Sequence, residues 1–228
     1  MNPIAERIAQ TQARIQAAAQ AASRPVENLH LLAVSKTRSA DEIEAAVSAG
    51  LTQFGENYLQ EALPKIEALR SHDLEWHFIG PVQSNKTRDL AAHFDWVQSV
   101  DRPKILRRLN EHRSAWAPPL NICIQVNISG EPQKAGVLPQ EALALCETCC
   151  QLQRLQLRGL MVIPQASTDP KQQLASFSQA KALFDEFCAQ GLPLDTLSMG
   201  MSGDLEAAIE AGSTMLRIGT DIFGPRSK

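Results

Sequence analysis

The sequence of 228 residues lacks the features that would point to nucleic acid, to a membrane or to secretion. It has no excess of basic residues, because its formal net charge is −3 at pH 7, and such a chain is a poor electrostatic match to nucleic acid or anionic lipid. No apolar run approaches the length of a membrane span, and the N-terminus has no hydrophobic signal core. We therefore expect a cytoplasmic protein that binds neither nucleic acid nor membranes.

A complete set of metal ligands is also missing. The five cysteines are an odd number, which together with the missing signal core indicates reduced thiols. Cys146, Cys149 and Cys150 are spaced so that they share one face of a helix, but no second such group and no histidine pair accompanies them. We interpret them as small residues on a helix face and predict no metal site.

The third missing feature is a linker, and what is present instead is a regular alternation of strands and helices. Eight β-rich runs lie at 29–36, 53–57, 75–80, 96–100, 120–128, 155–163, 194–200 and 213–220. Strands that alternate with helices are parallel and joined by right-handed crossovers, and eight such units suit a closed barrel of this length. A doubly wound open sheet is the alternative, but no GxGxxG motif follows the first strand.

These patterns predict a (β/α)8 TIM barrel with an additional N-terminal helix, in a single domain over residues 1–228. Ser39 and Glu42 have the spacing of a capping box for the helix after the first strand. Pro64 falls within the next helical stretch, so we expect that helix to be kinked or split.

Polar residues follow the apolar strands at the end where such barrels place their chemistry. Lys36 ends the first strand and shares a face with Leu32 and Val34. An amine at the mouth of an apolar barrel is partly desolvated, which favours its neutral form and lets it attack a carbonyl to form a Schiff base. A lysine that extends from a strand end into solvent is the alternative at this point.

The loops after the seventh and eighth strands favour the functional interpretation. The segment SMGMSGD carries Ser202 just before a helix, and STMLRIGT carries Arg217, Gly219 and Thr220 at the last strand end. Glycines let backbone N–H groups approach an anion, and these two loops build the commonest phosphate site of such barrels. A Schiff-base lysine that faces a phosphate site suits an aldehyde that carries a phosphate, and pyridoxal 5′-phosphate (PLP) is the obvious ligand.

Several segments resemble one known family. LLAVSK, FGEN, WHFIGPVQSNK, RGLM, LSMGMSGD, AAIEAGSTMLRIGT and the final IFG occur in the order and spacing of the pyridoxal phosphate homeostasis proteins, and the resemblance covers nearly the whole chain. That family is similar in fold to the barrel domain of alanine racemase and bacterial ornithine decarboxylase. Its members bind PLP and have no established enzymatic activity.

The resemblance assigns roles to residues of this chain. It implies that Lys36 forms the Schiff base, that Ser202, Gly219 and Thr220 bind the phosphate, and that Arg217 faces the pyridine nitrogen. It further implies pocket-lining roles for a second group of side chains, namely Asn57, His77, Met161, Ser198 and Met201.

The expected chemistry of this site is limited. Racemisation normally takes two bases on opposite faces of the cofactor, and in the racemase the second is a tyrosine from another domain. The sequence ends soon after its last strand, so we expect no such domain, and nothing marks its single tyrosine, Tyr58, as a base. Arg217 beside the pyridine nitrogen opposes protonation of the ring, which weakens the ring as an electron sink.

We therefore predict a monomeric protein that holds PLP as a lysine Schiff base and buffers or delivers it, without robust catalysis. Apo PLP enzymes are the expected recipients. A weak PLP-dependent racemase or decarboxylase of the same fold is the alternative, and a class I aldolase-like barrel whose Lys36 attacks a sugar phosphate is a third. Lys134, in the loop SGEPQKAG after the fifth strand, is a candidate relay amine for release of the cofactor.

Overall fold

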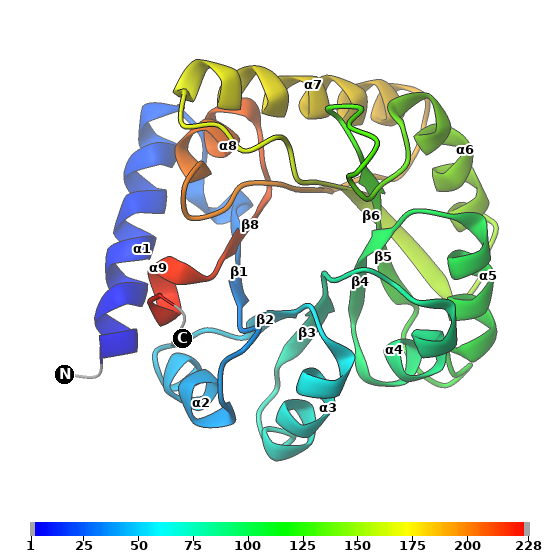
Figure 1. The fold of residues 1–228 in the computed structure, drawn as a ribbon, viewed down its shortest axis with the longest axis horizontal. Helices are drawn as coiled ribbons and strands as arrows, with labels where there is room; N and C mark the ends of the chain where they lie inside the picture. Colours follow the sequence, from blue (N-terminus) through cyan, green and yellow to red (C-terminus); the bar gives the residue numbers. More distant parts are fainter. Residues whose placement is uncertain (1–2, 226–228) are drawn as a thin grey trace.

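The computed structural model describes residues 3–225 and confirms the predicted barrel (Figure 1). Its eight parallel strands pair in chain order, and β8 pairs back onto β1 to close the sheet. The strands are β1 (His30–Val34), β2 (Gln53–Glu56), β3 (Glu75–Phe78), β4 (Trp96–Val100), β5 (Leu120–Val126), β6 (Leu155–Val162), β7 (Thr196–Ser198) and β8 (Met215–Ile218). Closure therefore gathers all eight C-terminal strand ends around one rim.

The helices form a ring outside the strands (Figure 1). They are α1 (Pro3–Ala21), α2 (Ala40–Ser48), α3 (Leu59–Ala68), α4 (Thr87–His93), α5 (Pro103–His112), α6 (Pro139–Cys150), α7 (Pro170–Ala189), α8 (Leu205–Ala211) and α9 (Thr220–Phe223), with 3₁₀ turns at Val26–Asn28 and Ser84–Lys86. The expected additional N-terminal helix is α1, which packs against α8 and α9. Across residues 3–225, no helix combines the length and the apolar character that crossing a membrane requires.

The local sequence signals in α2 and α3 have different outcomes. The capping box is confirmed, because the Ser39 side chain accepts from the Glu42 N–H and the Glu42 side chain accepts from the Ser39 N–H. However, α3 runs through Pro64 as one helix, so the expected split is wrong. Buried side chains on both sides of the proline, Ala62 and Lys65, anchor the helix to the barrel and outweigh the hydrogen bond that Pro64 removes.

Two separate groups of buried side chains fill the molecule. The larger group packs the outer face of the strands against the helices and includes Cys146 and Cys149 of α6, whose burial raises the pKa of Cys146 to about 12. Within residues 3–225, no three His, Cys, Asp or Glu side chains are grouped so as to hold a metal ion. The smaller group, Trp96, Cys123 and Met161, lies on the strands β4, β5 and β6.

Candidate functional site

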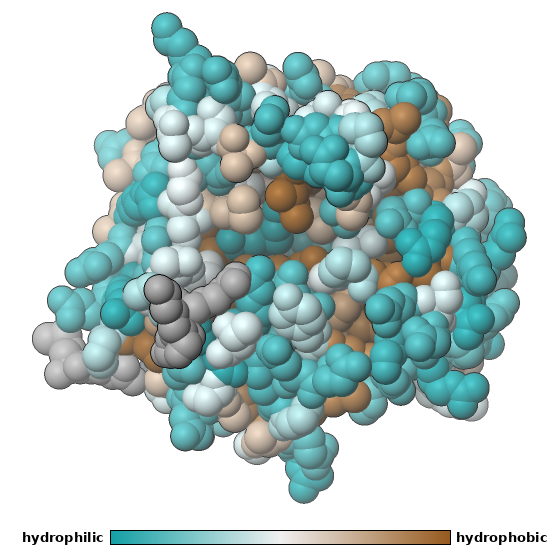
Figure 2. Space-filling model, in the orientation of Figure 1, coloured by the Kyte–Doolittle hydropathy of each residue, from teal (hydrophilic) through white to brown (hydrophobic). Residues whose placement is uncertain are grey.

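A cavity of about 340 Å³ opens at the C-terminal end of the strands. It is lined by Val34, Lys36, Asn57, Ile79, Ile163, Met201, Ser202, Gly203, Arg217, Gly219 and Thr220. Most of these residues lie at or just beyond the ends of β1, β2, β3, β6, β7 and β8. In Figure 2, apolar surface shows near the centre of the face, among polar side chains. The barrel thus brings together most of the site residues predicted from sequence.

Lys36 reaches the cavity from the end of β1 and is half-buried. The preceding residue, Ser35, donates its N–H to the Gly55 carbonyl at 3.0 Å, which extends the pairing between β1 and β2. The following residue, Thr37, has a φ of +64°, which a non-glycine residue rarely adopts, and its N–H donates to Glu61 Oε2 at 3.0 Å. Lys36 is therefore held between a paired strand end and a constrained turn.

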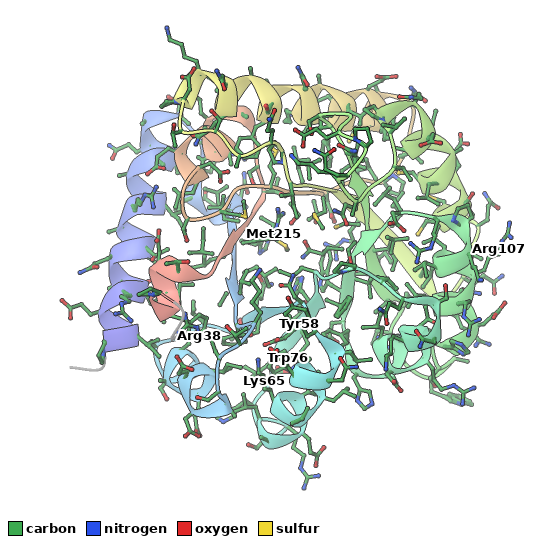
Figure 3. The ribbon with its side chains drawn as sticks, in the orientation of Figure 1. Arg38, Tyr58, Lys65, Trp76, Arg107 and Met215 are labelled. Atoms are coloured by element: carbon green, nitrogen blue, oxygen red, sulfur yellow. The ribbon has the colours of Figure 1, made fainter. Side chains whose placement is uncertain are left out.

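A buried ion pair lies directly behind Lys36. Lys65 of α3, labelled in Figure 3, places Nζ 2.8 Å from Glu56 Oε1 and donates to the Ser35 carbonyl at 3.0 Å. The Ser35 hydroxyl donates to the same Glu56 oxygen at 2.6 Å. Burial raises the pKa of Glu56, although the hydrogen bonds from Lys65 and Ser35 oppose this shift. The group joins β1, β2 and α3 at the base of the Lys36 side chain.

Arg217 enters the cavity from β8 with only 4% of its surface exposed. Its Nη1 donates to Ser198 Oγ at 2.7 Å and its Nη2 donates to the Val162 carbonyl at 2.9 Å. Both partners are neutral, and desolvation lowers the pKa of Arg217 to about 10. The guanidinium therefore stays charged at neutral pH, and the two hydrogen bonds fix its orientation.

The hydrogen bonds continue from Arg217 through the barrel interior. The Ser198 hydroxyl donates to Gln98 Oε1 at 2.7 Å, across the barrel from β7 to β4. Gln98 Nε2 lies 2.8 Å from His77 Nδ1 and 3.1 Å from the sulfur of Met215, which is labelled at the centre of the ring in Figure 3. His77 Nε2 lies 2.8 Å from Glu75 Oε1 on the other side of the imidazole.

This chain of contacts sets the protonation of the histidine. Because the Gln98 amide donates to Nδ1, the proton of neutral His77 lies on Nε2 and is donated to Glu75. Complete burial lowers the pKa of His77, which keeps the ring neutral.

Three predicted pocket residues therefore lie deeper than the cavity wall. His77, Met161 and Ser198 are fully buried, and none of them lines the cavity. His77 stacks on Trp96 with ring centroids 5.0 Å apart, and Met161 packs against the same tryptophan and Cys123. Ser198 is in contact with Arg217 and reaches the cavity only through it.

The loops after β7 and β8 form one wall of the cavity. Ser202 and Gly203 come from the first loop, and Gly219 and Thr220 from the second. A Cβ added to Gly203 would meet no protein atom within 4 Å, so protein packing does not demand a glycine there. The two loops touch where the Asp221 N–H donates to Ser202 Oγ at 3.4 Å.

Asn57 separates this cavity from a second one of about 280 Å³. Asn57 Oδ1 is buried, and within the described part of the chain it has no hydrogen-bond partner. A Cβ at Gly80 would lie 2.0 Å from the Asn57 carbonyl oxygen, so only glycine permits this approach of two loops. Lys134 lines the second cavity, with Nζ 2.8 Å from Glu131 Oε2.

Sequence reasoning missed Gln98 and Lys65. Gln98 has a signal that was available, since it is the polar residue in the middle of the buried strand WVQSV and a buried amide must find partners. Lys65 has no such signal, because a lysine in a helix is normally exposed.

Comparison with known proteins identifies the family of this chain. A family model described as "Alanine racemase, N-terminal domain" matches residues 7–227. A protein of Pseudomonas aeruginosa named "Pyridoxal phosphate homeostasis protein" is 55% identical over 226 residues, which cover 99% of this chain and 97% of the relative. The chain belongs to the pyridoxal phosphate homeostasis protein family.

Solved structures agree with the family. PipY of Synechococcus elongatus, solved with PLP bound, is 38% identical with a TM-score of 0.84, and the match covers 97% of this chain and 100% of PipY. An alanine racemase of Clostridium difficile matches 95% of this chain and 57% of its own with a TM-score of 0.69. At 14% identity, the racemase shows only that the two barrels share a fold.

Proposed function

We propose that this protein binds PLP in the cavity at the C-terminal end of the barrel and buffers or delivers it, as part of vitamin B6 homeostasis. The names of the relatives and the PLP-bound structure of PipY support this function. The observation that carries it is the charge of the lining, because among the described residues its ionisable side chains are Lys36 and Arg217 and it includes no carboxylate. Such a lining suits a ligand that carries a phosphate and an aldehyde.

The residues present suit each part of PLP. The hydroxyls of Ser202 and Thr220 and the backbone of Gly203 and Gly219 lie on one wall, where they would hold the phosphate. The open space at Gly203 lets an anion approach the backbone. The unpartnered oxygen of Asn57 is available to accept a hydrogen bond from a ligand or a bound water.

Lys36 would hold the cofactor covalently. When PLP is bound, its aldehyde carbon supplies an electrophile with which Nζ of Lys36 forms a Schiff base, with loss of one water molecule. The ion pair of Glu56 and Lys65 behind Ser35 fixes the backbone from which Lys36 extends.

Arg217 would face the pyridine nitrogen with its charge intact. Its hydrogen bonds to Ser198 and Val162 hold the guanidinium in place, so a cation next to the ring opposes proton uptake by the nitrogen. We infer a protein that retains the cofactor without robust catalysis.

The proposal extends to the location, the oligomeric state and the partners of the protein. We propose a cytoplasmic monomer that passes PLP to apo PLP enzymes, and the five unpaired thiols are consistent with a reducing compartment. Lys134 stays a proposed relay for release, because its cavity shares Asn57, Ile79 and Ile163 with the main cavity.

Reduction with borohydride tests the covalent bond. We expect the PLP-loaded wild type to retain one reduced adduct, located on Lys36 by peptide mass spectrometry. Lys36→Ala is expected to lose the adduct and the visible absorption while it still binds PLP weakly through the loops. Lys104→Ala, an exposed lysine on α5, serves as the matched control and keeps the adduct. A full adduct on another residue of Lys36→Ala would disprove the assignment.

A further inference from the structure

The additional helix α1 reaches the cavity loops from outside the barrel. It lies along the flank of the barrel beside α8 and α9 (Figure 1), and its buried side chains include Ile8 and Ile15. Arg14, between these two isoleucines in the sequence, extends to the loops after β7 and β8. It does not line the cavity, so it acts on a ligand only through other residues.

The Arg14 guanidinium connects the two loops. Nη1 donates to the Ser202 carbonyl at 2.8 Å and to Asp221 Oδ2 at 2.8 Å. Nη2 donates to Glu206 Oε2 at 2.6 Å, near the start of α8. Ser202 itself lines the cavity, Asp221 follows the cavity residue Thr220, and Glu206 lies three residues after Gly203. One side chain therefore fixes the spacing of both loops from behind.

Arg14 also offsets negative charge close to the loops. Asp221 and Glu206 are carboxylates beside the wall that would hold a phosphate, and each would repel a dianion. The hydrogen bond from Arg14 lowers the pKa of Glu206, so this carboxylate is ionised at neutral pH and forms an ion pair with the guanidinium.

We propose that Arg14 is a positioning residue for the phosphate of the bound ligand. It sets the distance between the Ser202 and Thr220 loops and neutralises the carboxylates of Glu206 and Asp221. The inference rests on the proposed function, since it assigns the phosphate to these two loops. Its effect is specific for the phosphate and does not extend to the aldehyde, which the proposed function assigns to Lys36 at the end of β1.

Two ligands separate this role from a general structural one. Dissociation constants are measured for PLP and for pyridoxal, which has the same ring and aldehyde but no phosphate, with inorganic phosphate as a competitor. In Arg14→Met we expect PLP affinity to fall ~10-fold and pyridoxal affinity to change less than ~2-fold, because a charge-assisted contact to the phosphate loops is lost. Arg14→Lys restores the charge and is expected to recover part of the preference for PLP.

Arg24 provides the matched control. It lies just after α1, and its Nη1 donates to the Ile209 carbonyl at 2.7 Å, far along α8 from the cavity loops. Arg24→Met should lower the melting temperature and leave the ratio of PLP to pyridoxal affinity unchanged.

The outcomes distinguish the two proposals. If Arg14→Met keeps the wild-type ratio, or weakens both ligands equally, Arg14 only docks the helix and the inference is wrong. If Arg14→Met fails to fold, Arg14→Gln replaces it, because its amide can still donate to the Ser202 carbonyl but carries no charge, and a wild-type ratio in Arg14→Gln leads to the same conclusion. A wild-type protein that binds pyridoxal as tightly as PLP would overturn the proposed phosphate site itself, and the inference with it.

Discussion

Two buried cations lie close to the cavity, and their charges are balanced in different ways. Lys65, behind Lys36, contacts the carboxylate of Glu56 at 2.8 Å. Arg217, on the cavity wall, donates its hydrogen bonds within residues 3–225 to the neutral oxygens of Ser198 and Val162. The charge of Lys65 is therefore neutralised within the protein, whereas the charge of Arg217 remains available to a ligand. The comparison separates a cation that is paired within the fold from one that is proposed to face the ligand.

The largest effect is expected when the ion pair of Lys65 and Glu56 is broken. Lys65→Met leaves Glu56 buried without a counter-charge, so we expect the free energy of unfolding of the cofactor-free protein to fall by about 3–5 kcal/mol. Urea denaturation measures this loss. The control is Lys181→Met, which removes a partly exposed contact with Asp185 and should cost less than about 1 kcal/mol. Equal losses in the two variants would show that the Glu56 pair is not a special support of the fold.

A second substitution would give Arg217 a carboxylate partner, as Lys65 already has. Ser198→Asp places a carboxylate next to the guanidinium, and we expect PLP affinity to fall ~10-fold because the positive charge is then neutralised inside the protein. The side chain of Ser198→Asn has nearly the same volume as that of Ser198→Asp and keeps an acceptor, but it adds no charge. It should therefore change the affinity less than ~3-fold. Titration of PLP followed by visible absorption measures both. Similar losses in Asp and Asn variants would mean that shape, not charge, matters at this position.

The smallest expected effect concerns His77, the neutral histidine at the far end of the hydrogen-bond chain that starts at Arg217. Because burial lowers the pKa of His77, the unfolded chain binds a proton at a pH where the folded protein does not. Acid therefore favours unfolding, and stability should fall below pH ~6.5 by up to about 1.4 kcal/mol per pH unit from this residue.

Unfolding by urea at several pH values between about 5 and 7 measures this slope. His77→Gln should flatten it, whereas His93→Gln, at an exposed histidine, should leave it unchanged. An unchanged slope in His77→Gln would place the acid sensitivity elsewhere in the protein.

The sequence predicted the barrel and much of the cavity wall because both depend on local pattern. Each strand ends within a few residues of its predicted limit, and Lys36, Arg217 and Thr220 follow strand ends that closure must bring together.

Contacts between residues that are distant in the sequence could not be predicted from local pattern. Ser198 and Gln98 are 100 residues apart, and periodicity gives the face of a strand but not the partner across the barrel. The family resemblance predicts a pocket-lining role for His77, but this side chain is buried in the barrel interior. A step of two residues along the same face of the chain separates the buried interior from the cavity wall, and Ile79 lines the cavity instead.

The contacts of α1 also determine when the site can form during synthesis. Arg14 lies 188 and 207 residues before its partners Ser202 and Asp221. At the usual rate of translation, about 5–20 residues per second, α1 waits roughly 10–40 s for the strands and loops that it packs against. For that interval the buried face of α1, which includes Ile8 and Ile15, lacks its later partners α8 and α9. A ribosome-bound chain that has not yet released its last two loops therefore lacks β8, the strand that pairs with β1 and carries Arg217, so the cavity cannot form until synthesis of the barrel is complete.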